Sequence, residues 1–226
     1  MGLKNNPHEH EDTIFATVLA DGKIHVSAKE GDEGAVKRNY ATDEDKKSGS
    51  EKKTGVKWEF LYTELTGMIQ KVDFFEGDFG INLQVVVGDE DDEKPITLSL
   101  STSSNYAEDL MKKLPAINLK KPVKIAPYAF EDGKTGKMKK GVTVTQPNKK
   151  GEAEKIQSFY YDADKKANIN KYPPIPKSKS GKALTKTEWR KYFAACQDFL
   201  IEDITERFHI EEANSKTKAD KEFEDF

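Results

Sequence analysis

The chain has 226 residues, of which 34% are charged and 35% are hydrophobic, and its formal net charge is −3. This length suits one domain with tails, and the short apolar runs indicate a modest core with polar loops. We find no membrane-span-length apolar run and no secretory signal, and the single cysteine excludes an internal disulfide and a thiolate-rich zinc site, so we expect a cytoplasmic protein.

Charge is distributed unevenly along the chain. Residues 1–111 carry a net charge of −11 and residues 192–226 carry −6, whereas residues 112–191 hold 21 Lys and Arg against 7 Asp and Glu, a net charge of +14. Scattered surface lysines need no explanation, but an excess of this size within one segment favours an anionic partner.

The first hundred residues have the pattern of strands. Two short apolar segments flank Asp21-Gly22, a dipeptide typical of hairpin turns, and a polar stretch near 29–55 predicts a loop or a disordered insertion. Alternating residues then predict a strand in "VKWEFLYTEL" and further strands near 64–75, 79–87 and 94–101.

The second half begins with a change of period. A short helix is predicted near 104–114, opened by Ser103 or Ser104, and strands follow near 121–130 and 137–145, with "EKIQSFYYD" as a third late strand. Three strands, a helix and two strands is the order of an OB-fold, a five-stranded Greek-key barrel with a helix between strands 3 and 4. A generic α+β sandwich remains the alternative.

The last part of the chain predicts a long amphipathic helix. Thr185 and Glu188 form a capping box, and an apolar stripe at helical spacing runs from Trp189 to Phe208. This stripe must cover the barrel or a second copy of the chain, so a homodimer stays open. The expected organisation is a flexible tail over 1–12, an OB-fold domain with an extra N-terminal hairpin over 13–165, a basic Pro-rich linker over 166–184, the helix over 185–210 and a disordered acidic tail over 211–226.

Catalytic patterns are absent from the sequence. There is no Gly-rich phosphate loop and no H-E-x-x-H, the four histidines suggest no triad, and the acidic run Asp89–Glu93 lacks the spacing of a calcium loop. We therefore expect a binding protein with no cofactor and no metal, and not an enzyme.

The basic segment interleaves aromatic residues with lysines. Lysines attract phosphates, and aromatic rings stack on unpaired bases of any sequence. With only Arg38, Arg190 and Arg207, bidentate reading of bases is not expected. The candidate DNA-binding residues are Lys124, Tyr128, Phe130, Lys134, Lys137, Lys139, Lys140, Phe159, Tyr160, Tyr161, Lys165, Lys166 and Tyr172.

Packing is the competing role for these aromatic residues. Neighbours in a strand alternate faces, so at least one of Phe159, Tyr160 and Tyr161 must point away from the other two. We expect about half of the named aromatics to be core. Trp58, Phe60 and Tyr62 form a second candidate platform, but their acidic surroundings favour packing.

The end of the chain, "ADKEFEDF", combines acidic residues with two aromatics that have no evident core to enter. Together with the strand order over about 64–161, the segment "KADKEFEDF" resembles the bacteriophage single-stranded DNA-binding proteins. The resemblance implies sequence-independent binding of single-stranded DNA in replication, recombination and repair within a host cytoplasm. It also implies recruitment of a DNA polymerase or a helicase/primase through the tail residues Asp220, Glu222, Phe223, Glu224, Asp225 and Phe226.

Two features depart from that family: the helix between barrel and tail, and a tail that is shorter and less acidic. Two rival functions remain open. One is an RNA-binding or strand-annealing OB-fold protein, and the other is a protein-interaction module whose basic surface meets an acidic partner.

Overall fold

The computed structural model describes residues 13–49, 53–77, 80–89, 94–176 and 183–224, with the side chains of the last helix given as far as Phe208. The fold is mainly β. Its elements in chain order are β1 (Ile14–Val18), β2 (Ile24–Ala28), β3 (Val36–Tyr40), α1 (Asp43–Lys47), β4 (Gly55–Tyr62), β5 (Leu65–Gly77), β6 (Gly80–Gly88), β7 (Ile96–Ser101), α2 (Asn105–Met111), the 3-10 helix η1 (Leu114–Ala116), β8 (Val123–Glu131), β9 (Met138–Pro147), β10 (Ala153–Lys155), β11 (Tyr161–Asp162), β12 (Ala167–Asn168) and α3 (Lys186–Glu224).

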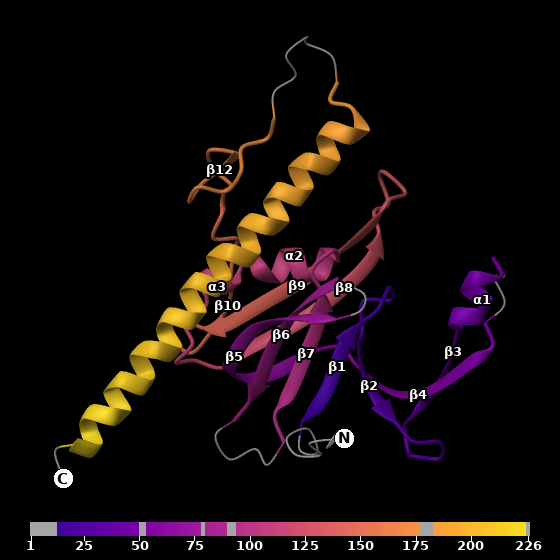
Figure 1. Ribbon diagram of the computed structural model, residues 1–226, viewed down its shortest axis with the longest axis horizontal. Helices are drawn as coiled ribbons and strands as arrows, with labels where there is room; N and C mark the ends of the chain where they lie inside the picture. The colour runs from indigo at the N-terminus through magenta and orange to yellow at the C-terminus, as the bar shows by residue number, and fades with distance from the viewer. Residues whose placement is uncertain (1–12, 50–52, 78–79, 90–93, 177–182, 225–226) are drawn as a thin grey trace, which may run out of the picture.

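Strands β1 to β10 join into one open sheet, and α3 crosses in front of it in the view of Figure 1. The order across the sheet is β10-β9-β8-β5-β6-β7-β1-β2-β4-β3. The predicted sequence of three strands, a helix and two strands is confirmed in β5 to β9 with α2. However, β7 pairs in parallel with β1, so the added N-terminal hairpin takes the sheet edge that closure of a five-stranded barrel would use. The sheet is therefore not a closed barrel.

The core forms where the alternating patterns predict it. Leu83, Val85 and Val87 of β6 and Leu98 and Leu100 of β7 are buried together, because every second residue of these strands faces the same side. Helix α2 adds an apolar face to this core. It begins where the capping pattern predicts, with Ser104 accepting a hydrogen bond from the Ala107 N–H at 3.1 Å.

The polar stretch near 29–55 contains regular structure that its composition did not predict. Strand β3 pairs with β4, and α1 follows with a capping box in which Thr42 and Asp45 hydrogen-bond to each other's backbone N–H. The guanidinium of Arg38 donates to both carboxylate oxygens of Glu59, at 2.6 and 2.7 Å. Paired charges, rather than apolar alternation, hold this strand in the sheet, so the prediction of a loop or disordered insertion is wrong for β3 and α1.

The turn of the first hairpin lies against β8. Gly22 has a φ of +73°, and a Cβ atom there would lie 2.4 Å from the Ala129 backbone nitrogen. The two ring nitrogens of the buried His25 lie between carboxylates, with Nε2 3.0 Å from Asp21 and Nδ1 2.8 Å from Glu59. The contacts of His25 with Asp21 and Glu59 therefore hold this turn against β8. The close approach leaves room only for a glycine at position 22.

The predicted third late strand is wrong in its extent. Strand β10 ends at Lys155 and β11 begins at Tyr161, because the chain between them turns inward and the Phe159 N–H donates to the Lys112 carbonyl at 2.7 Å. Part of the expected linker over 166–184 is likewise packed, since it supplies β12 and the buried ring of Tyr172.

Helix α3 starts at the predicted capping box, where Thr185 Oγ1 and Glu188 hydrogen-bond at 2.8 Å. It continues to Glu224, past the predicted end at 210 and through most of the segment predicted to be disordered. The reason is that residues 186–224 contain neither Gly nor Pro. Among the described helices, none has the length and hydropathy needed to cross a membrane.

Candidate functional site

The hairpin of β8 and β9 carries the first group of predicted site residues. Phe130 pairs with Lys139 across the two strands, and the ring of Tyr128 lies 5.7 Å from the ring of Phe130. Phe130 is 51% exposed, and the nearby Met138 is 53% exposed. The hairpin therefore presents an apolar, partly aromatic surface directly beside a cation.

A glycine opposite Tyr128 explains how its ring is placed. Tyr128 pairs with Gly141, and a Cβ atom at Gly141 would lie 2.5 Å from the Tyr128 hydroxyl oxygen. The ring thus lies over the neighbouring strand, in the space that the missing side chain leaves. Burial and the charge of Asp109 raise the pKa of Tyr128, so the phenol is neutral at physiological pH.

The loop between β8 and β9 is shaped by Asp132. One of its carboxylate oxygens accepts hydrogen bonds from the Lys134 and Thr135 N–H groups, each at 3.0 Å, and the carboxylate pairs with Lys139. These contacts, with the Lys139 bond first, lower the pKa of Asp132. Within the part of the chain that the structure describes, Lys134 and Lys137 make no ion pair and remain available to an anion.

The remaining lysines of this group differ in their availability. Lys124 is exposed on β8 and pairs with Glu64 at 3.1 Å, and Lys140 on β9 is half-buried. A phosphate would have to compete with Glu64 for Lys124. The hairpin tip is therefore the most cationic part of this surface.

Two predicted base-stacking residues are core instead. Tyr160 is 1% exposed and Tyr172 is 7% exposed, with ring centroids 5.5 Å apart. Phe199 of α3 packs edge-on against both rings, and Tyr160 donates its hydroxyl to Asp203 at 2.5 Å. Burial, followed by the Asp203 bond, raises the pKa of Tyr160. These tyrosines hold α3 on the domain and cannot reach a ligand.

The other members of the second group also differ in exposure, although Phe159 and Tyr160 lie in a turn and not in the predicted strand. Phe159 is half-buried beneath the Arg207 guanidinium, 4.9 Å from its ring centroid, whereas Tyr161 is 46% exposed. Lys165 and Lys166 are exposed in the turn between β11 and β12, and Lys165 pairs with Asp162 at 3.0 Å. The structure therefore keeps Tyr161 and both lysines on the surface, apart from the β8–β9 hairpin in sequence and on a separate two-stranded sheet.

The apolar stripe of α3 is not uniformly covered. Cys196, Leu200 and Ile204 are buried, as expected for packing, but Trp189 and Phe193 are exposed near the start of the helix. The helical spacing of the stripe gave no sign of this division. The sequence feature that could have indicated the exposed part of the stripe is Arg190 and Lys191, two cations that lie between Trp189 and Tyr192.

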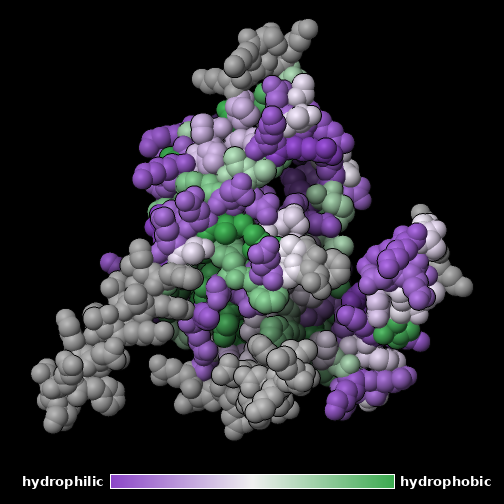
Figure 2. All heavy atoms as spheres, in the orientation of Figure 1, coloured by the Kyte–Doolittle hydropathy of each residue, from purple (hydrophilic) through white to green (hydrophobic). Residues whose placement is uncertain are grey.

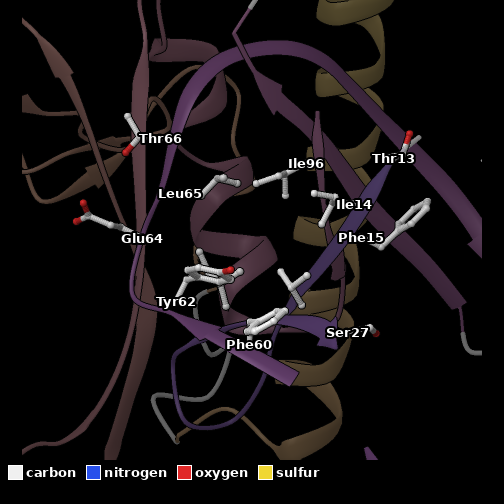
Figure 3. Close-up of a pocket in the computed structure, with 12 residues that line it drawn as sticks. Thr13, Ile14, Phe15, Ser27, Phe60, Tyr62, Glu64, Leu65, Thr66 and Ile96 are labelled. Carbon is white, nitrogen blue, oxygen red and sulfur yellow. The ribbon is translucent and has the colours of Figure 1, made fainter. Parts of the chain in front are cut away.

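A cavity of about 740 Å³ lies between β1, β2 and β4 on one side and the start of β5 on the other. Phe60 and Tyr62 reach it from β4, opposite Ile14 and Ile96 (Figure 3). Among the described residues that line it, Glu64 alone is charged. This lining offers no attraction for a phosphate backbone. The expectation of packing is wrong for Tyr62, which is 48% exposed at this cavity, and Phe60 is only half-buried.

The ionic cluster around Glu59 has no nucleophile and serves the fold. The Arg38 hydrogen bonds, aided by His25, lower the Glu59 pKa from 4.5 to about 2, although burial opposes the shift. No group of three His, Cys, Asp or Glu suited to a metal ion occurs among the described residues.

The predicted partner-binding tail lies largely outside what the structure describes. The backbone of Asp220, Glu222, Phe223 and Glu224 belongs to α3, but their side chains are not described, and Asp225 and Phe226 fall outside the described residues. No protein-family model matches the chain, and searches of curated proteins and of solved structures find no match either.

Proposed function

We propose that this protein binds single-stranded DNA without sequence preference and acts as an accessory protein of DNA replication, recombination and repair. The observation that carries the proposal is the β8–β9 hairpin, where exposed Phe130 lies beside Lys139 and where Lys134 and Lys137 of the turn make no ion pair with any described residue. Lysines neutralise phosphates, and an exposed aromatic ring offers a surface on which a base of any sequence can stack.

The strand pairing supports an OB-like ancestry for this surface. Strand β5 pairs with both β6 and β8, β6 pairs with β7, and β8 pairs with β9, with α2 between β7 and β8. In an OB-fold the loop between strands 4 and 5 contacts nucleic acid, and the corresponding loop here is the β8–β9 turn. The β1–β2 hairpin then replaces the direct pairing that closes an OB barrel.

The acidic segment after residue 210 supports a second role. Its carboxylates can compete with phosphate for the lysines of the hairpin, by an attraction that salt screens, when the C-terminal end of α3 unwinds and folds back toward them. When DNA occupies the lysines, Phe223 and Phe226 are free to enter an apolar, basic-rimmed pocket on a DNA polymerase or a helicase/primase.

Titration of labelled oligo-dT with the whole chain, followed by fluorescence anisotropy at several salt concentrations, tests the proposal. We expect binding at low salt that weakens steeply as salt rises. Lys134→Gln and Lys137→Gln should each reduce the slope of log K against log[salt] by about 0.7, the value for one phosphate contact on a single strand. Lys37→Gln, on the edge strand β3, and Lys53→Gln, just before β4, are the matched controls and should leave the slope unchanged.

The same assay separates the rival functions. Equal or tighter binding of oligo-U at the same salt would favour the RNA-binding reading. Absence of any oligonucleotide binding at low salt would contradict the proposal and leave a protein-interaction module.

A further inference from the structure

The first turns of α3 carry an exposed pair of aromatic rings. Trp189 is 36% exposed and Phe193 is 55% exposed, and their rings are stacked with centroids 5.6 Å apart and planes 21° apart. A third ring, Tyr192, adjoins both, at 5.9 and 5.5 Å. Residues spaced by four share one face of a helix, so Trp189 and Phe193 form one continuous apolar surface.

Tyr192 explains why the other two rings face outward. Its hydroxyl donates to the Pro173 carbonyl at 3.3 Å, and Asn168 Nδ2 donates both to that carbonyl, at 2.7 Å, and to the tyrosine hydroxyl, at 3.3 Å. These bonds bind the inner side of the helix to the segment after β12. The pair formed by Trp189 and Phe193 is thereby held rigidly at the surface.

The surroundings of this pair are cationic. Lys186 lies three positions before Trp189 and Arg190 lies three positions before Phe193, so both exposed cations share the helix face of the rings. The carboxylate of Glu188 is occupied at the start of the helix, where it accepts from the Thr185 N–H at 2.7 Å and from its hydroxyl. The patch therefore combines two stacked rings with two positive side chains, which is the chemistry that binds single-stranded nucleic acid.

A second copy of the chain is a poorer fit for the same surface. In a two-fold dimer the patch would face itself, so Lys186 and Arg190 of each copy would approach their equivalents. A polyanion instead gains from every one of these charges.

We infer that Trp189 and Phe193 form a second base-stacking platform, with Lys186 and Arg190 holding the flanking phosphates of the same single strand. The inference rests on the proposed function and extends its site. In Figure 1 the N-terminal end of α3 and the tip of the β8–β9 hairpin both lie at the upper right of the molecule. The exposed Tyr161 and Lys165 belong to the β11–β12 hairpin, which Asn168 connects to this helix.

Single-tryptophan variants give a direct test, because the chain has only two tryptophans. In Trp58→Phe, Trp189 is the remaining fluorophore, and saturating oligo-dT should quench it. In Trp189→Phe, the half-buried Trp58 of β4 should keep most of its fluorescence. An unquenched Trp189 at saturation overturns the inference.

Affinity supplies the second readout. Phe193→Ala should weaken oligo-dT binding by roughly fivefold or more, the fold-change for losing one stacked base. Phe75→Ala is the matched control, since Phe75 is 56% exposed on β5 in the acidic part of the chain. Thermal unfolding of both variants shows whether either has lost its fold.

The outcomes separate the two proposals. If the unaltered chain fails to bind oligo-dT, the proposed function fails. If it binds and Phe193→Ala binds equally well, only the platform fails. Light scattering tests whether a second copy of the chain occupies the patch instead. If the unaltered chain is a dimer and Phe193→Ala is a monomer, the patch joins two copies and the platform is overturned.

Discussion

Two aromatic clusters of similar composition have opposite environments in this protein. Tyr160 and Tyr172 lie beneath α3 with less than a tenth of their surface exposed, whereas about half of Phe130 is exposed on the β8–β9 hairpin. Both clusters come from the same basic segment, with lysines on either side. The difference lies in what covers them: α3 packs on the first and leaves the second open.

The buried and the exposed aromatic residues also differ in the charge of their neighbours. The face drawn in Figure 2 has hydrophobic residues at its centre and hydrophilic residues around them. Under α3, Tyr160 meets the acidic Asp203, while at the hairpin Phe130 meets Lys139. An aromatic residue beside a carboxylate and inside the domain serves packing, and one beside a lysine at the surface is suited to an anionic ligand.

Truncation of the buried cluster should have the largest effect. Tyr160→Ala removes a fully buried ring and its bond to Asp203, so we expect the free energy of unfolding to fall by about 3–5 kcal/mol. Urea unfolding followed by circular dichroism measures this. Tyr161→Ala, at the adjacent exposed position, should change stability by less than about 0.5 kcal/mol. Similar losses for both variants would show that the two positions are not distinguished by burial.

The buried ionic cluster should contribute the next largest effect. The Glu59 pKa is depressed from 4.5 to about 2, so its stabilisation is complete above the unfolded value and is lost as the pH falls through this window. Glu59→Gln should lower the free energy of unfolding at pH 7 by about 2–3 kcal/mol.

The pH dependence is the decisive part of that experiment. The difference between the unaltered chain and Glu59→Gln should shrink as the pH falls from 4.5 toward 2. A difference that stays constant with pH would show that the loss comes from altered packing and not from the charge.

Phe130 should show the opposite behaviour, with binding lost and stability kept. Phe130→Ala is expected to weaken oligo-dT binding by roughly 1–3 kcal/mol, because one stacking face is lost. Its unfolding free energy should change by less than about 0.5 kcal/mol, since the ring is half exposed. Anisotropy and urea unfolding on the same preparation measure both. If stability falls and affinity does not, Phe130 belongs with the packing cluster.

Removal of residues 219–226 should have the smallest effect on DNA binding. We expect affinity for oligo-dT to stay the same or to rise slightly, and more so at low salt, because carboxylates that compete with phosphate are removed. Recruitment of a polymerase or helicase/primase, measured by pull-down with the purified partner, should be lost. Weaker DNA binding by the truncated chain would argue against competition between tail and DNA.

Much of the fold was predictable from local patterns. Period-two alternation located β6 and β7, the Asp21-Gly22 turn located the first hairpin, and the capping residues Ser104 and Thr185 marked the starts of α2 and α3. These predictions hold because they depend on interactions within a few residues of the chain.

The errors share a cause as well. Strand β3 is held by the bond between Arg38 and Glu59, and β7 is paired with β1, and neither partner is near in sequence. Closure of the predicted barrel depended on such a pairing.

The sequence by itself determined the order of β5 to β9 along the chain, the starts of α2 and α3 and the concentration of positive charge in residues 112–191, because each follows from neighbouring residue types. Only the tertiary structure decided which aromatic residues of that segment are covered. A side chain becomes core when a distant element packs on it, and α3 packs on Tyr160 and Tyr172 while leaving Phe130, Trp189 and Phe193 exposed.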